Sequence, residues 1–111
     1  MQVTNNATKI AELRAKADKG DAAAQTDLGQ MYEQGNGVPE DYAEAVKWYR
    51  KAAEQDYAHA QFQLGDMYDL GQGVDYDETE AVKWWRKAAD QYRKSAQPQS
   101  LNCPRRQRFG F

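Results

Sequence analysis

Apolar residues recur along the chain with the period of an α-helix. In residues 21–34 they follow the spacing i, i+4, i+7 and i+8, which places them on one helical face. These positions are Ala24, Leu28, Met31 and Tyr32. Residues 41–55 carry a broader stripe of alanine, valine, tryptophan and tyrosine. Glycines and then acidic residues separate the two segments, as the end of one helix and the start of the next require. The pattern predicts a pair of packed helices.

The same pattern occurs twice. LGQMYEQGNGV, from Leu28, returns as LGDMYDLGQGV from Leu64, and residues 22–55 match residues 58–91 at 21 of 34 positions. Self-similarity at a period of 36 residues indicates a solenoid of stacked helix pairs. The stretch TKIAELRAKADKG falls in the register of a second helix. Four segments are predicted: a capping half-repeat over 1–20, repeats over 21–56 and 57–92, and a tail with a truncated third repeat over 93–111.

Gly29 and Gly65 lie inside predicted helices, where glycine costs about 1 kcal/mol relative to alanine. A recurring glycine at this register suggests that a neighbouring side chain approaches the helix backbone closely. We expect the indoles of Trp48 and Trp84 to make that contact. The recurrence of these tryptophans in both copies indicates core positions.

Charge is unevenly distributed along the 111 residues, although the net charge is only −2. Residues 93–111 hold five basic residues and no acidic ones, whereas residues 1–92 carry a net charge of −7. We expect no nucleic acid to bind the acidic body, because phosphates would be repelled. No apolar run approaches the length of a membrane span. Residues 1–20 lack the pattern of a secretory signal, so we expect a cytoplasmic rather than an exported protein, although a removed signal would leave no trace.

Few residues in the sequence could act in catalysis or bind a metal. The single histidine, His59, and the single cysteine, Cys103, offer neither a metal-ligand set nor a nucleophile with its base. The glycine pairs lack the strand, lysine and hydroxyl residue of a phosphate-binding loop. Asp41 and Asp77 follow these turns and are interpreted as helix N-caps. The sequence therefore predicts no catalytic site, no metal and no cofactor.

The motif AxAQxxLGxMYxxGxGVxxDxxxAVKWxRKAAxQ resembles the Sel-one-like repeat, a relative of the tetratricopeptide repeat, over residues 22–91. The resemblance implies an all-α fold, a short right-handed α–α superhelix of about five helices. It also implies a non-enzymatic protein–protein interaction module, an adaptor or scaffold. A dedicated inhibitor or immunity protein against one enzyme is the alternative. A hydrolase-like role, linked to cysteine-rich relatives, is a third reading that one cysteine does not favour. The resemblance leans toward a bacterial source.

Partner binding is expected on the helix face opposite the apolar one, which lines the concave surface in tetratricopeptide arrays. In the first copy this face also holds Ala23 and Thr26. The candidate partner-binding residues are Asp27, Gln30, Gln34, His59, Phe62, Gln63, Asp66 and Leu70. Phe62 and Leu70 make the second copy more apolar than the first. Packing of Phe62 between repeats is an equally open interpretation.

The end of the second repeat is predicted to lack a complete neighbour, because Pro98 interrupts the third copy just after Ala96 and Gln97. Apolar surface near Val82, Trp84, Trp85 and Tyr92 then needs a cover. Three outcomes are open: the basic tail folds back in a partly ordered form, which we favour; the chain associates weakly with itself; or a partner docks.

Overall fold

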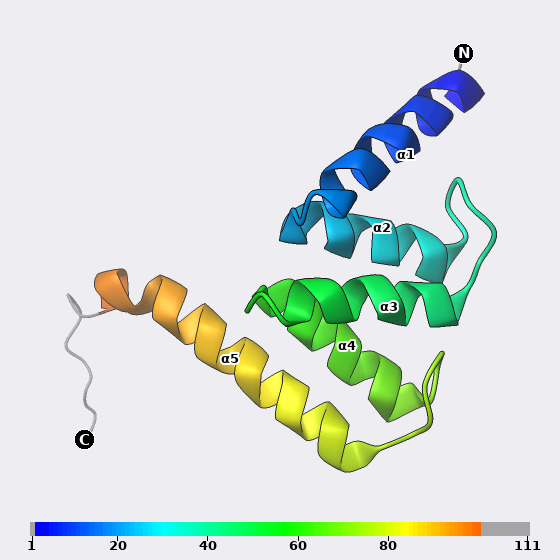
Figure 1. The fold of residues 1–111 in the computed structure, drawn as a ribbon. Coiled ribbons are helices and arrows are strands. Elements are labelled where there is room, and N and C mark those ends of the chain that lie inside the picture. Colours follow the sequence, from blue (N-terminus) through cyan, green and yellow to red (C-terminus); the bar gives the residue numbers. More distant parts are fainter. Residues whose placement is uncertain (1, 101–111) are drawn as a thin grey trace, which may run out of the picture.

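The computed structural model describes the backbone of residues 2–100 and the side chains of residues 8–94. Five helices make up this part of the chain: α1 (Gln2–Asp18), α2 (Ala22–Gln34), α3 (Tyr42–Ala53), α4 (Ala58–Leu70) and α5 (Glu78–Ser100) (Figure 1). Residues 2–100 contain no strand, which confirms the all-α prediction. Most of the predicted tail, including Cys103, lies outside the described residues.

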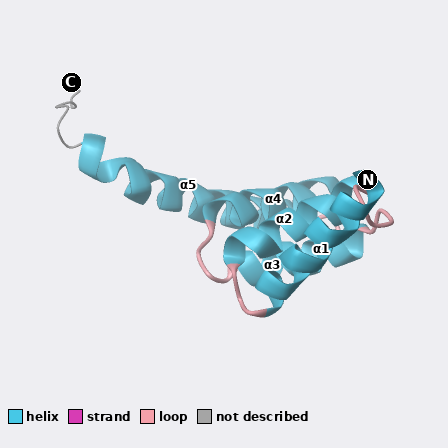
Figure 2. Cartoon of the chain, turned by 90° about the horizontal axis from the view of Figure 1, so that it is seen from above, coloured by secondary structure: helices cyan, strands magenta, loops and turns pink. Residues whose placement is uncertain are grey.

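The helices stack in chain order into a short solenoid. Each helix packs on the helix before it: α2 on α1, α3 on α2, α4 on α3 and α5 on α4. From above, α2 and α4 lie on one side of the stack and α1 and α3 on the other (Figure 2). The molecule is elongated, with extents of 55 × 32 × 23 Å.

Helix ends follow from local sequence. The carboxylate of Asp21 accepts a hydrogen bond from the amide of Ala24, and Asp41 and Asp77 cap α3 and α5 in the same way. The N-cap interpretation of Asp41 and Asp77 is thereby confirmed. Gly35 ends α2 in the left-handed conformation, which costs glycine little (φ 67°).

The junctions between repeats use the same polar contacts twice. The side-chain amide of Gln25 donates to the carbonyl oxygen of Ala17 at 3.0 Å, and Gln61 donates to Ala53 at 3.1 Å. These bonds add a second donor to carbonyl groups at the ends of α1 and α3, which also accept from the backbone amides of Gly20 and Asp56. Each junction therefore joins the start of one repeat to the end of the helix before it.

The close contact at the helix glycines involves different aromatic residues from those predicted. A Cβ built on Gly29 would lie 2.7 Å from the ring of Tyr49, and one on Gly65 would lie 2.5 Å from the indole of Trp85. The assignment to Trp48 and Trp84 was wrong by one residue. Trp48 instead packs in a cluster with residues of α1 and α2, so the adjacent aromatic faces the glycine.

Helix α5 continues past the position where α1 and α3 stop. Gly20 and Asp56, 36 residues apart, each take a positive φ in the turn that follows a helix (100° and 65°). The next equivalent position is Tyr92, which lies inside α5. Glycine and aspartate enter the left-handed region more readily than a bulky aromatic residue does. The helix therefore runs on to Ser100, and residues 93–100, assigned to the tail by sequence, are helical.

Candidate functional site

We call the surface formed by the eight candidate residues the α2–α4 face. Its members come from these two helices: Asp27, Gln30, Gln34, His59, Phe62, Gln63, Asp66 and Leu70. One direct bond joins the two helices across it, because the amide nitrogen of Gln30 lies 2.9 Å from Nε2 of His59. An amide nitrogen only donates, so the ring nitrogen accepts. The bond fixes α2 relative to α4 on this face.

The α2 part of the face borders α1. Asp27, Gln30 and Gln34 line a hollow of about 220 Å³ together with Lys9 and Leu13 of α1. Charged and amide side chains form most of its lining, beside the apolar Leu13 and Met31. Asp27 and Gln34 are exposed.

The α4 part of the face is more apolar, as the sequence predicts. Phe62 and Leu70 are exposed, and Leu70 shows 63% of its surface to solvent. They stand eight residues apart on one helix, a separation of about 12 Å along its axis. Gln63 is half-buried beside Phe62.

Thr26 does not belong to the exposed face, contrary to the sequence interpretation. It is 1% exposed and donates to the carbonyl oxygen of Ala22, whereas Phe62 at the same register is 45% exposed. The neighbours of Thr26 explain the difference, because Gln25 accepts a hydrogen bond from Gln55 and Gln30 contacts His59. This register lies against the following repeat, and no described helix follows α5. Phe62 therefore stands at the border between the α2–α4 face and the end of the solenoid.

Asp66 has a structural role in addition to its place on the face. Its carboxylate accepts a hydrogen bond from the indole N–H of Trp85 at 3.2 Å. Burial raises the pKa of Asp66, and the nearby carboxylates of Glu33 and Asp69 act in the same direction, against the Trp85 bond. The bond holds Asp66 against α5, which makes it a poor probe for partner binding.

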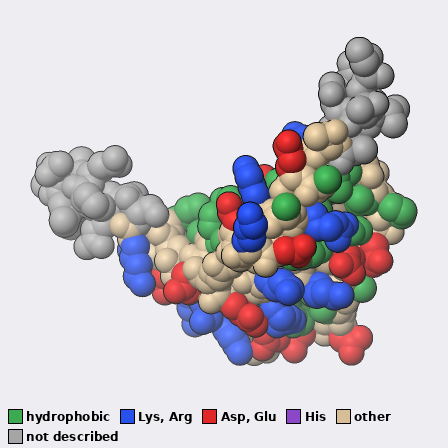
Figure 3. Space-filling view, turned by 45° about the horizontal axis from the view of Figure 1, so that its top comes forward, with side chains coloured by type: hydrophobic (Ala, Val, Ile, Leu, Met, Phe, Trp, Pro, Cys, Tyr) green, Lys and Arg blue, Asp and Glu red, His purple; other side chains and the backbone are tan. Residues whose placement is uncertain are grey.

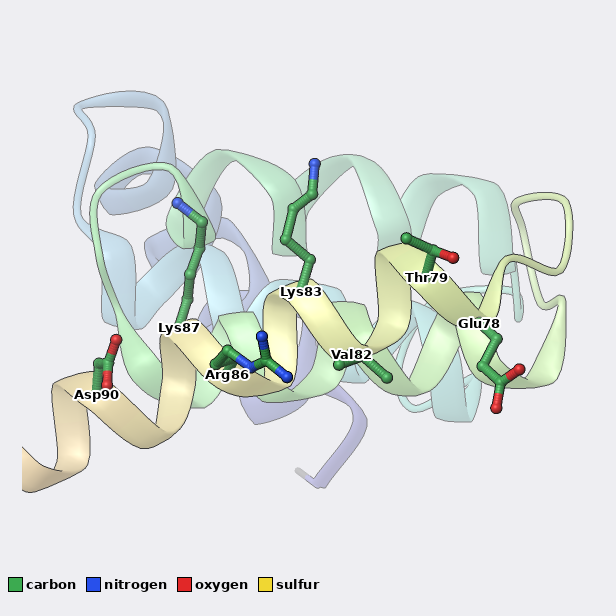
Figure 4. A pocket seen from close by; sticks show the side chains of 7 residues that line it. All are labelled: Glu78, Thr79, Val82, Lys83, Arg86, Lys87 and Asp90. Atoms are coloured by element: carbon green, nitrogen blue, oxygen red, sulfur yellow. The ribbon is translucent and has the colours of Figure 1, made fainter.

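A second surface, on the outer side of α5, has no counterpart among the predicted site residues. An open hollow on this side is lined from one helix by Glu78, Thr79, Val82, Lys83, Arg86, Lys87 and Asp90 (Figure 4). Val82 is among the residues predicted near the uncovered end, whereas Arg86 is not among the predicted residues. The signal that identifies it is the repeat itself, because Arg86 occupies the register of Arg14 and Arg50.

No three His, Cys, Asp or Glu residues cluster closely enough to hold a metal ion within the described part of the chain. No helix in residues 2–100 has the length and apolar character needed to cross a membrane. On the face in Figure 3, the described basic and acidic side chains are interspersed over the body.

Comparisons with known proteins agree with this geometry. The family model described as the Sel1 repeat matches residues 22–57 and 58–92. A Sel1 repeat protein from Oxalobacter formigenes is 41% identical, with a TM-score of 0.72 over 74% of this chain and 34% of its own. Helicobacter pylori cysteine-rich protein B is 27% identical, with a TM-score of 0.73 over 80% of this chain and 67% of its own.

A curated relative matches over a shorter stretch. The secretory immunoglobulin A-binding protein EsiB of Escherichia coli O6:H1 is 45% identical over 43 residues, which is 39% of this chain and 9% of EsiB. The chain thus spans a small part of EsiB and about a third of the Oxalobacter protein. Both repeats and the helical stack place the chain in one family: it belongs to the Sel1 repeat family.

Proposed function

We propose that this chain is a non-enzymatic protein-interaction module that binds a protein partner through the α2–α4 face. Sel1 repeat proteins are generally protein-interaction modules and typically not enzymes. One relative, EsiB, is named for binding secretory immunoglobulin A. The observation that carries the proposal for this chain is the exposed apolar pair Phe62 and Leu70 on α4.

The α2–α4 face has the composition of a small recognition surface. Two exposed apolar side chains stand among polar ones, and a few residues of a protein interface usually supply most of its binding energy. The Gln30–His59 bond holds the supporting helices in place before binding, which lowers the ordering cost. Two repeats offer limited area, so we expect a modest affinity for an extended peptide or a single helix.

The test is an affinity capture from lysate of the source organism, with Leu70→Ser and Phe62→Ser as separate variants. Each substitution removes one apolar anchor, and we expect each to weaken capture of the same protein by about tenfold. Tyr76→Ser is the matched control, because Tyr76 is as exposed as Leu70 (62% against 63%) but lies in the α4–α5 turn. Circular dichroism checks that all variants remain helical.

The two α4 variants separate this face from the end of the solenoid. Loss with both Leu70→Ser and Phe62→Ser, and retention with Tyr76→Ser, supports the α2–α4 face. If only Phe62→Ser abolishes capture, the binding surface lies at the border next to α5. Capture that survives both substitutions refutes the proposed face.

A further inference from the structure

The outer side of α5 repeats a surface that is already used once inside the molecule. Val46 on α3 is 6% exposed, because it packs in a cluster with residues of α4 such as Leu64 and Met67. Its equivalent on α5, Val82, is 39% exposed and lines the open hollow (Figure 4). The same residue type at the same register is thus covered on α3 and uncovered on α5, within residues 2–100.

An arginine marks the same surface on three helices. Arg14 of α1 donates to the hydroxyl of Tyr32 at 2.7 Å, and Arg50 of α3 donates to the hydroxyl of Tyr68. The guanidinium of Arg50 also lies over the Tyr68 ring, 5.8 Å from its centre. Arg86 of α5 lines the hollow at the equivalent position. Each earlier junction therefore pairs this arginine with a tyrosine of the following helix.

The beginning of α5 also corresponds to a covered part of α3. The α4–α5 turn lies over the beginning of α3 so closely that a Cβ on Gly73 would be 2.4 Å from the carbonyl oxygen of Tyr42. The equivalent start of α5 contributes Glu78 and Thr79 to the hollow. On α3, the equivalent surface is covered by α4 and by the α4–α5 turn. On α5, the same surface is the open hollow.

We propose that the outer side of α5 binds, in trans, an amphipathic helix that resembles the first helix of a Sel1 repeat. Its contact stripe would read Ala-x3-Leu-x3-Tyr, the arrangement of Ala60, Leu64 and Tyr68 in α4. The leucine would cover Val82, and the tyrosine hydroxyl would accept from Arg86. The hydrogen bond that Gln61 donates to the carbonyl of Ala53 would have no equivalent here, because α5 continues past Ala89 and keeps the carbonyl of Ala89 in its own helix.

Two other occupants fit this surface less well. The tail beyond residue 100 is basic, with three arginines, and would approach Lys83, Arg86 and Lys87. It also carries Pro104 at the register of Tyr68, without a hydroxyl to accept from Arg86. Within residues 2–100, a second copy of the chain offers no free helix of the required type, because α2 and α4 each already pack between two neighbours.

The experiment is a titration of the isotope-labelled protein with a synthetic peptide of residues 57–72, followed by amide NMR shifts. We expect the shifts to concentrate on residues 78–90 and to saturate. Arg86→Ala in the protein and Tyr68→Phe in the peptide should each weaken binding by about tenfold, since each removes one charge-assisted hydrogen bond. Combined, they should cost little more than either alone, because both delete the same contact.

Arg93→Ala is the matched control. Arg93 lies on α5 outside the residues that line the hollow and pairs with Asp90 of its own helix at 3.3 Å, so the substitution should leave peptide affinity unchanged. The proposal is overturned by an absence of shifts at millimolar peptide, by shifts centred on Leu70 and Phe62, or by fully additive losses. It is also overturned if dilution of the protein alone shifts residues 78–90, which would make a second copy the occupant. Since this surface is distinct from the α2–α4 face, either proposal can fail without the other.

Discussion

The contact between Gly65 and Trp85 shows how one missing side chain sets the distance between two helices. A Cβ at position 65 would lie 2.5 Å from the indole and 3.0 Å from the carbonyl oxygen of Ala81, closer than packed atoms approach. Gly65→Ala should therefore lower the free energy of unfolding by about 2 kcal/mol, despite the better helix propensity of alanine. Urea denaturation followed by circular dichroism measures the change.

Removing the indole of Trp85 shows how much of the cost of Gly65→Ala comes from the clash with that ring. Trp85→Ala is destabilising by itself, but in its background Gly65→Ala should cost much less, because the clash with the indole is gone and only the 3.0 Å approach to the carbonyl oxygen of Ala81 remains. If Gly65→Ala costs the same in both backgrounds, Trp85 does not set the helix distance.

The sequence identifies these glycines through their helix cost but does not identify their partners. Trp48 and Tyr49 are adjacent, both are aromatic, and both lie on a broad apolar stripe that contacts two neighbours. Which ring faces the glycine depends on the rotation of α3 by one residue, about 100°, and spacing alone does not resolve that rotation. Thr26 was misplaced for a related reason, since its burial comes from the neighbouring repeat.

A single residue, Tyr92, is expected to control the length of α5. Positions 20 and 56 hold glycine and aspartate in left-handed turns, whereas position 92 holds tyrosine within the helix. Tyr92→Gly should end α5 near residue 91, because glycine is favoured at helix ends and costs about 1 kcal/mol inside them. Pro98 weakens the distal segment further, since it lacks the amide hydrogen for a helical bond.

Backbone NMR shifts of residues 93–97 measure this effect. They should be helical in the wild type and lose helical character in Tyr92→Gly. Tyr92→Ala provides the control, because it removes the same aromatic ring but favours the helix. Equal helicity in the glycine and alanine variants would show that position 92 does not determine where α5 ends.

At the level of helices, periodicity predicted most of what the structure shows. The predicted ranges 21–34 and 41–55 correspond to α2 and α3 with differences of one or two residues at their ends. Aspartate caps and glycine turns explain this agreement, because both are local signals. The extension of α5 was missed because the truncated third repeat, Ala96 and Gln97, imitates the start of a new helix.

The whole molecule is a linear stack, so its stability should vary along its length. Helices α2, α3 and α4 each pack extensively on two neighbours, whereas α1 and α5 each have one extensive partner within residues 2–100, α2 and α4 respectively. In such a stack, stability is close to a sum of repeat and interface contributions. Native-state hydrogen exchange should find the most protected amides in α2–α4 and the least protected in the first half of α1 and the distal half of α5.

Two chemically similar substitutions test this linear picture. Gln25→Ala and Gln61→Ala each remove an amide that bonds a helix-end carbonyl, at 3.0 and 3.1 Å, but at different junctions. Gln25→Ala also removes the acceptor of the Gln55 bond in the exposed α3–α4 turn, but its main effect should be to release α1, with the protection of α4 and the adjoining part of α5 nearly unchanged. Gln61→Ala lies between the two repeats and should lower protection throughout, by about 1 to 3 kcal/mol. Equal, uniform losses in both variants would mean that the five helices unfold as one cooperative unit, with no gradient along the stack.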